Sequence, residues 1–269
     1  MRYAVIFLLC LLASFRLALL PLFAMQALNN TDDLIRQSTF IFNGTVEKLN
    51  ATTMKSVNAT EATAVVRIDE VIDAPGAPPD LARKTITVQL RQSGSFRVGQ
   101  HATFFTKGWL LGNSMAVIEV GHLMEAEAAP SVQKQVSTVH RRMADEQLQS
   151  EMTTADAIVS GTVRAVRPSK IAHIGSEHDP DWYQAEIAVA ATLKGKIASD
   201  TVVVFFPHSD DVMWHDSPKF KEGERGVWLL HRNQVRFPSV EDQYTALRPL
   251  DFQQQIQIER VQRLLKGTR

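Results

Sequence analysis

The chain has 269 residues, of which 45% are hydrophobic, and its 29 basic residues balance 29 acidic residues. This neutrality leaves no excess of positive charge with which to bind the phosphates of nucleic acid, so we expect a protein or a small molecule as the partner. The length suits two domains of ordinary size.

Residues 1–27 are predicted to be a signal peptide. Arg2 supplies a short positive region, and Tyr3 to Phe15 form an apolar stretch of signal-peptide length. An uncleaved N-terminal anchor is the alternative, but it would place Arg16 in the hydrocarbon, where an arginine costs about 2.5–3.5 kcal/mol on insertion scales. We therefore expect a periplasmic or extracellular protein, with an anchored protein as the alternative.

The cysteine content indicates the compartment. The single cysteine, Cys10, lies in the predicted signal peptide, so the mature chain would be cysteine-free. Secreted eukaryotic domains of this size usually carry disulfides, so a bacterial envelope or periplasmic protein is favoured. Asn-x-Thr sequons at Asn29, Asn43, Asn50 and Asn58 point the other way, and the sequence leaves their use open.

The rest of the chain contains one pattern twice, at an offset of about 120 residues. Each copy has a strand ending in Gly-Thr-Val, two further strands, a Phe-x-x-Gly turn and an aromatic strand. Alternation of apolar and other residues is typical of half-buried strands. The matched segments are 38–46 with 155–163, 64–68 with 185–189, 85–90 with 201–206, 96–99 with 220–223, and 102–105 with 226–229.

This pattern predicts two tandem five-stranded antiparallel OB-like barrels, each followed by an amphipathic helix. A β-sandwich repeat is the alternative, but an immunoglobulin-type sandwich needs seven strands and a Cys…Trp…Cys pattern. The expected divisions are barrels at 29–130 and 153–250, a linker helix at 131–152 and a C-terminal helix at 251–269.

Apolar residues predict which faces of the two helices are buried. In the linker helix they recur at intervals of three and four, at Val132, Val136, Val139 and Met143. The C-terminal helix is expected to be capped by Asp251 and to bury one face, formed by Phe252, Ile256, Val261, Leu264 and Leu265.

Three segments of the second copy resemble exported bacterial modules related to the tissue-inhibitor-of-metalloproteinases and netrin-like OB-folds. These segments are Ala155–Val163, the strand end Leu193-Lys194-Gly195 and the block Phe220–Leu230. The resemblance covers both copies and implies the OB-like fold. Inhibition in that family uses an N-terminal cysteine that chelates a protease zinc, and no cysteine follows Cys10, so the resemblance does not carry inhibition over to this chain.

Two loops of the second copy are expected to emerge at the same end of the barrel, because they follow its first and third strands. Their imidazole and carboxylate groups are what a zinc or similar divalent site requires, and their aromatic side chains could wall a ligand pocket. Ordinary polar surface loops are the alternative, since no fixed metal-ligand spacing is present. The predicted metal ligands are His173, His178, Asp179, His208, Asp211 and His215, and the predicted ligand-binding aromatics are Trp182, Tyr183 and Trp214.

A fourth predicted ligand-binding residue, Trp109, lies in the first copy. It belongs to an apolar tip, residues 107–113, expected between the fourth and fifth strands. If exposed, this tip would mark a contact with a partner or a membrane. The alternative is that it packs against the linker helix or the other barrel.

The sequence has no nucleophile elbow, phosphate-binding loop or dinucleotide fingerprint. We therefore expect a non-catalytic binding or interaction protein, with its ligand surface on the loops of the second copy and no cofactor. The alternatives are a metal-dependent hydrolase that uses the His/Asp loops and a membrane-anchored structural protein of the envelope.

Overall fold

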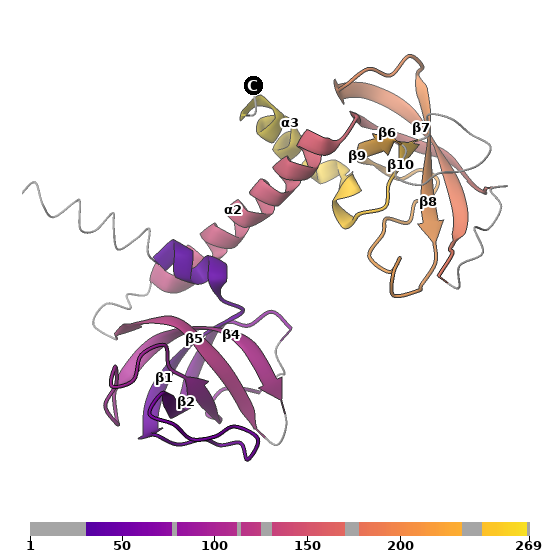
Figure 1. Ribbon diagram of the computed structural model, residues 1–269. Helices are drawn as coiled ribbons and strands as arrows, with labels where there is room; N and C mark the ends of the chain where they lie inside the picture. The colour runs from indigo at the N-terminus through magenta and orange to yellow at the C-terminus, as the bar shows by residue number, and fades with distance from the viewer. Residues whose placement is uncertain are drawn as a thin grey trace, which may run out of the picture. The chain divides into compact units, whose positions relative to one another are not determined.

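A computed structural model (Figure 1) describes residues 31–76, 80–111, 114–124, 131–169, 178–232 and 244–267. The predicted signal peptide lies outside the described residues. The chain divides into two compact units, and the division falls between Met143 and Ala144. None of the helices in the described ranges has the length and apolar character needed to cross a membrane.

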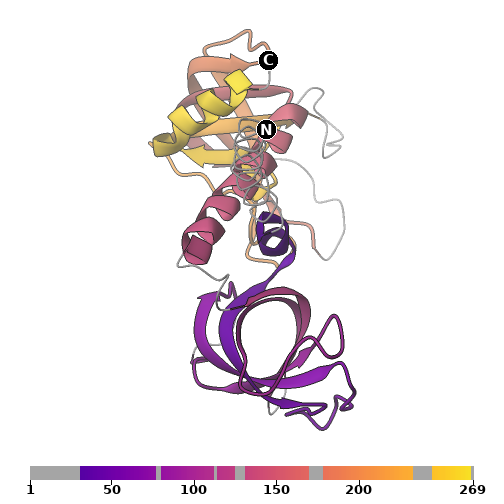
Figure 2. The same ribbon diagram turned by 90° about the vertical axis from the view of Figure 1, so that its left-hand side faces the viewer.

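The first unit contains a closed barrel, which Figure 2 shows end-on as a ring. Its strand order is β1-β2-β3-β5-β4, and β4 pairs back onto β1. Stacked phenylalanine rings fill the interior: Phe42 lies between Phe40 and Phe104, with ring centroids 4.7 and 5.2 Å away. The strands are β1 (Phe40–Leu49), β2 (Thr63–Asp73), β3 (Thr85–Gln89), β4 (His101–Leu111) and β5 (Met115–Met124).

The second unit repeats this order, as β6-β7-β8-β10-β9. The ring closes through the two residues of β10, which pair with β8 on one side and with β9 on the other. An added strand, β11 (Phe252–Gln254), pairs with β9. The buried ring of Trp228 is at the centre of the core. The barrel strands are β6 (Ala157–Pro168), β7 (Asp181–Lys194), β8 (Thr201–His208), β9 (Arg225–Arg232) and β10 (Tyr244–Thr245).

The prediction of two tandem five-stranded OB-like barrels is confirmed, and closure of both sheets excludes the sandwich alternative. The prediction that the barrels are wholly antiparallel is wrong for one strand pair in each. β3 pairs with β5, and β8 with β10, in parallel. The fourth strand returns to pair with the first, so the fifth enters between the third and fourth and runs in the direction of the third.

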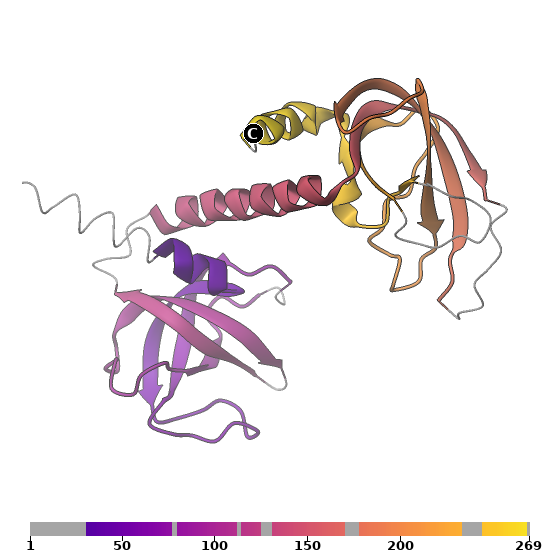
Figure 3. The same cartoon turned by 45° about the horizontal axis from the view of Figure 1, so that its top comes forward.

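Helix α2 (Ser131–Thr154) covers part of each barrel with a different stretch of its length. In the first unit Val132, Val136 and Val139 are buried against β1, β4 and the helical segment 31–37. These valines belong to the predicted stripe, and Met143 is partly buried beside them. In the second unit Leu148 and Met152 pack on β9 and on α3 (Ile258–Gly267). Figure 3 shows α3 beside this part of α2.

The C-terminal helix begins at Ile258 and not at the predicted residue 251. The intervening residues form the 3-10 turn η1 (Pro249–Asp251), strand β11 and the 3-10 turn η2 (Gln255–Gln257). Asp251 does not cap the helix, because its carboxylate accepts the backbone N–H groups of Leu247 and Arg248. The predicted apolar face therefore fails at Ile256, which is 83% exposed, and holds at Val261, which is buried.

The predicted tip at Trp109 is also different, because β4 continues to Leu111. Gly108 adopts a φ of 67°, and the ladder between β4 and β5 shifts register between Lys107 and Leu110. The strand thus bulges where the sequence suggests a turn between glycines. The side chain of Trp109 lies outside the described part of the structure, so its predicted role as a contact stays a prediction.

The glycine of each Gly-Thr-Val element is required by crowding where the first strand of the barrel bends. The strand shifts register at this glycine in both copies, between Asn43 and Gly44 and between Ser160 and Gly161. A Cβ atom on Gly161 would lie 2.2 Å from the carbonyl oxygen of Ala188, well inside van der Waals contact. A bulged strand in such close contact with its neighbour has no room for a side chain.

The end of α2 is fixed by a lysine from the second barrel. Lys194, at the end of β7, donates three hydrogen bonds of 2.7–2.8 Å to the carbonyl oxygens of Met152, Thr153 and Ala155. These carbonyls lie at the C-terminus of the helix, where a cation is favoured by the helix dipole. Lys194 therefore joins α2 to the barrel.

We predict that Gly161→Ala lowers the free energy of unfolding of the second barrel by about 2–3 kcal/mol, because the methyl group would overlap a backbone oxygen. Urea unfolding followed by tryptophan fluorescence reports mainly on this barrel, since Trp182, Trp214 and Trp228, three of the four tryptophans, belong to it. Gly267→Ala is the control, because nothing lies within 4 Å of its added Cβ. Equal stability of the two variants would contradict the prediction.

Replacement of Lys194 by methionine should destabilise the second unit by about 1–2 kcal/mol, because charge-assisted hydrogen bonds to the end of α2 are lost while the apolar stem is kept. The matched control is Lys196→Met, at an exposed position two residues along the chain. Denaturant midpoints of both variants and of the wild type measure the difference. A loss no larger than that of the control would show that this cap contributes nothing.

Candidate binding rim on the second barrel

The two loops predicted to share one end of the second barrel do lie side by side. β7 starts where β8 ends, and Asp181 and His208 are direct partners across the two strands. The residues before β7 and after β8 therefore form one edge of the barrel mouth. We refer to residues 178–181 and 208–219 as the rim.

Hydrogen bonds hold the two loops of the rim together. Nδ1 of His178 lies 3.1 Å from Oδ2 of Asp211, and the indole N–H of Trp214 donates to the backbone oxygen of His178 at 2.7 Å. The other carboxylate oxygen of Asp211 accepts the backbone N–H of Met213 at 2.8 Å. This hydrogen bond and, next, the one from His178 hold the pKa of Asp211 below its ordinary value.

The predicted aromatic residues Trp182 and Tyr183, which follow the rim at the start of β7, contact rim residues. Trp182 is buried and meets Trp214 edge-on, with ring centroids 5.8 Å apart. Tyr183 stacks on the imidazole of His208 at 4.5 Å. The aromatic side chains thus pack against Trp214 and His208 of the rim.

A polar hollow of about 380 Å³ opens between the loops. Lys219 is one of its lining residues, and the ammonium group of this lysine donates to the backbone oxygens of Trp214 and Ser217 at 2.7 and 2.9 Å. Burial lowers the pKa of Lys219, and the carboxylates of Asp210 and Asp216 oppose this shift only in part. The lining residues are Asp179, Asp181, His208, Ser209, Asp210 and Lys219.

Two large apolar side chains that are exposed to solvent follow Asp210, which lines the hollow, by two and three residues. Val212 is 92% exposed and Met213 is 59% exposed, although they adjoin the buried and half-buried aromatic residues of the rim. Single exposed apolar residues are ordinary on soluble proteins, and this adjacent pair offers apolar area that a partner could cover.

The predicted metal ligands are not gathered around one point. In the part of the chain that the structure describes, no three of His178, Asp179, His208, Asp211 and His215 bring ligand atoms within 4.8 Å of one another. His215 pairs instead with its neighbour Asp216 at an exposed position. His173 lies outside the described residues.

Sequence reasoning missed two features of the rim. Lys219 was not singled out, because a lysine in a polar loop is ordinary; the signal is its position between two aromatics, Trp214 and Phe220. The exposed pair Val212-Met213 was also missed, although two apolar residues within a run of aspartates and histidines could have drawn attention to it.

Comparisons with known proteins supply no family for this chain. No family model matches it, and no curated protein matches it. Among solved structures it is similar to a deletion mutant of the single-stranded DNA binding protein from Thermus aquaticus, at 10% identity and a TM-score of 0.21, over 80% of this chain and 92% of that one. A likeness at this level carries no argument about function.

The depressed pKa of Asp211 can be measured by following its carboxyl carbon by NMR during an acid titration. We expect a midpoint below the ordinary value and only a partial return toward it in His178→Ala, because the N–H of Met213 makes the larger contribution. The interactions of the ionised Asp211 would be lost as the pH falls through this lowered pKa. Asp200→Asn is the control, since Asp200 lies outside the rim. A full return to the ordinary value in His178→Ala would contradict the assignment.

Proposed function

We propose that this protein is an exported, non-catalytic binding module of the bacterial periplasm or cell surface, and that it binds its ligand at the rim of the second barrel. The observation that carries the proposal is the polar hollow beside an exposed apolar pair. Export is supported by the signal-like residues 1–27, and a bacterial over a eukaryotic setting is favoured by the absence of cysteine from the rest of the chain.

The charge of the hollow indicates the chemistry of the ligand. Three carboxylates, from Asp179, Asp181 and Asp210, line it together with the single ammonium of Lys219. Lys219 is already engaged with backbone oxygens. A positively charged group complements such a lining, and an anionic one would be repelled.

The size and surroundings of the hollow favour a side chain of a partner over a large cofactor. Its volume of about 380 Å³ is near the lower end of the range for small-molecule sites. Val212 and Met213, two and three residues along the chain from the lining residue Asp210, add exposed apolar area to the same loop. We therefore propose a partner peptide or protein that inserts a basic side chain and places an adjacent apolar side chain on this pair.

A nucleic acid is not the proposed partner, because the chain carries no excess of basic residues. A labelled single-stranded oligonucleotide serves as a competing probe in the same experiment. Binding of that oligonucleotide, weakened by added salt, would contradict the proposed chemistry.

The proposal predicts that a capped peptide with arginine between two leucines binds to the wild type, and that the same peptide with glutamate in place of arginine does not. Asp181→Asn/Asp210→Asn should weaken binding about tenfold, because two partly exposed charge interactions are lost. Isothermal titration calorimetry measures both. Asp200→Asn is the matched control, since it removes a carboxylate outside the hollow.

Two outcomes would overturn the proposed function. Equal binding of the arginine and glutamate peptides would remove the charge argument. Hydrolytic turnover of ester or peptide substrates that depends on the rim residues would favour the hydrolase alternative. Membrane fractionation of cells that make the full chain separates the exported form from the anchored structural protein.

A further inference from the structure

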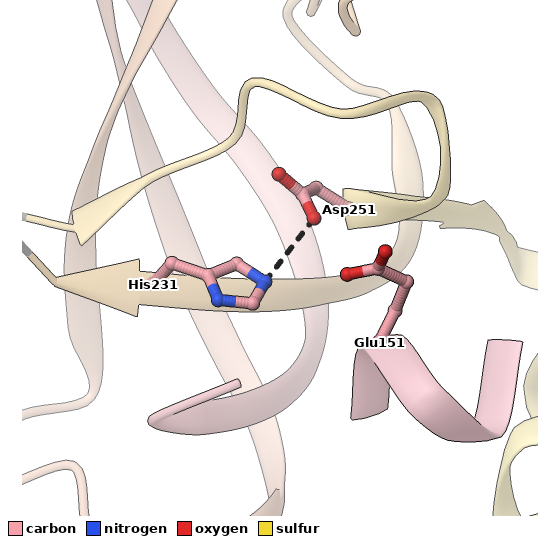
Figure 4. A group of neighbouring side chains, drawn as sticks. All are labelled: Glu151, His231 and Asp251. Carbon is pink, nitrogen blue, oxygen red and sulfur yellow. Dashed lines mark ion pairs between the residues drawn. The ribbon is translucent and has the colours of Figure 1, made fainter. Parts of the chain in front are cut away.

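A second group of titratable side chains lies in the second unit, outside the rim. Glu151 comes from the last turn of α2, His231 from β9 and Asp251 from η1 (Figure 4). One ligand atom from each lies within 4.8 Å of the others, and no other group of three in the described residues meets this condition. Glu151 and His231 are 80 positions apart in the sequence, and His231 and Asp251 are 20 apart, so the fold brings them together.

Asp251 presents an unsatisfied oxygen to this group. The residue is fully buried, and its Oδ2 accepts two backbone N–H groups, which fix the orientation of the carboxylate. Its Oδ1 lies 3.2 Å from Nε2 of His231, an ion-pair distance, yet accepts no hydrogen bond from it, so the ring N–H is not directed at it. A buried carboxylate oxygen in this state is costly, and an ion is one of its ordinary explanations.

The positive charge near these groups comes from Arg248. Its guanidinium forms an ion pair with Glu151, and Nε lies 3.8 Å from Oδ1 of Asp251. Nη2 is 3.1 Å from both ring nitrogens of His231, so it can donate to whichever of them carries no proton and occupies the position from which a metal would reach that nitrogen. The Arg248 side chain is 38% exposed, so its guanidinium has access to solvent and could exchange with another cation.

We propose that Glu151, His231 and Asp251 form a divalent transition-metal site for which Arg248 is the exchangeable cation. One imidazole and two carboxylates are a donor set that Zn²⁺ accepts, with a water completing four ligands. Two ligands about 2.0–2.2 Å from a tetrahedral zinc lie roughly 3.4 Å apart, close to the separation of His231 and Asp251. The Glu151 carboxylate, on the half-buried end of α2, closes the site when Arg248 leaves.

Binding at this site has a structural consequence. Glu151 belongs to α2, His231 to the barrel wall and Asp251 to the turn that follows β10, so one ion would join all three elements. A metal ion bound only to the folded form stabilises it by mass action. The proposal is independent of the ligand proposed for the rim.

The test is calorimetric titration of tag-free, metal-stripped protein with Zn²⁺, repeated with Co²⁺, whose visible absorption reports tetrahedral coordination. We expect one equivalent to bind to the wild type and none to bind at this affinity to Asp251→Asn or His231→Gln. Arg248→Gln should bind about tenfold more tightly, because the competing cation is gone. His178→Ala and Glu119→Gln, which remove a rim histidine and a buried carboxylate of the first barrel, should leave binding unchanged.

Two results would overturn the proposed metal site. If neither the wild type nor Arg248→Gln binds either metal, Arg248 is the permanent counter-ion of the cluster. If the ion binds but the cluster variants retain it, the site lies elsewhere. Arg248→Gln keeps the three ligands, so its affinity decides the question even if Asp251→Asn proves unstable by circular dichroism.

Discussion

Closure of each barrel depends on the bending of its first strand. β1 pairs with β2 along its length and with β4 over its first half, and β6 does the same with β7 and β9. A strand that pairs with one neighbour at its start and with another along its length must bend and twist strongly to close the barrel. The bulge at Gly44 in β1, or at Gly161 in β6, allows this bend. The aromatic cores and the rim exist only because these two strands turn the sheets back on themselves.

The second barrel has a crowded glycine at a position where the first barrel has an alanine. Gly226 lies opposite Gly161, and a Cβ there would meet the ring of Phe252 at 2.3 Å. The matching residue of the first barrel, opposite Gly44, is Ala102. The difference follows from β11, which brings Phe252 over β9 in the second barrel. The change from alanine in the first barrel to glycine in the second thus reflects the added strand that covers β9.

Most strands could be predicted from the sequence, because alternation such as Val66 and Ile68 records which side chains face a core. Pairing partners could not be predicted in this way, since periodicity is the same in parallel and antiparallel strands. Asp251 was wrongly predicted to cap the helix because an aspartate before apolar residues at helical spacing is typical of a helix start, whereas here it accepts backbone N–H groups of its own turn.

The rim could be predicted in part. Strand direction alone brings the loops of His178 and Asp211 together, but the distances that prevent a shared metal centre depend on side-chain torsions that no pattern records. The cluster of Glu151, His231 and Asp251 was out of reach for a different reason. Its members lie on a helix, a strand and a turn with no fixed spacing, and Asp251 is in place only because of the turn that precedes β11.

The position of β10 in the chain has a consequence for the order in which the protein can assemble during synthesis. All five strands of the first barrel, and the valines of α2 that cover it, precede residue 144. The second barrel gains its closing strand, its added strand and Val261 only from residues 244–261. The nascent chain can therefore complete the first barrel while the second is still an open sheet with exposed edges, which makes that interval the one in which the chain most needs protection from misassembly.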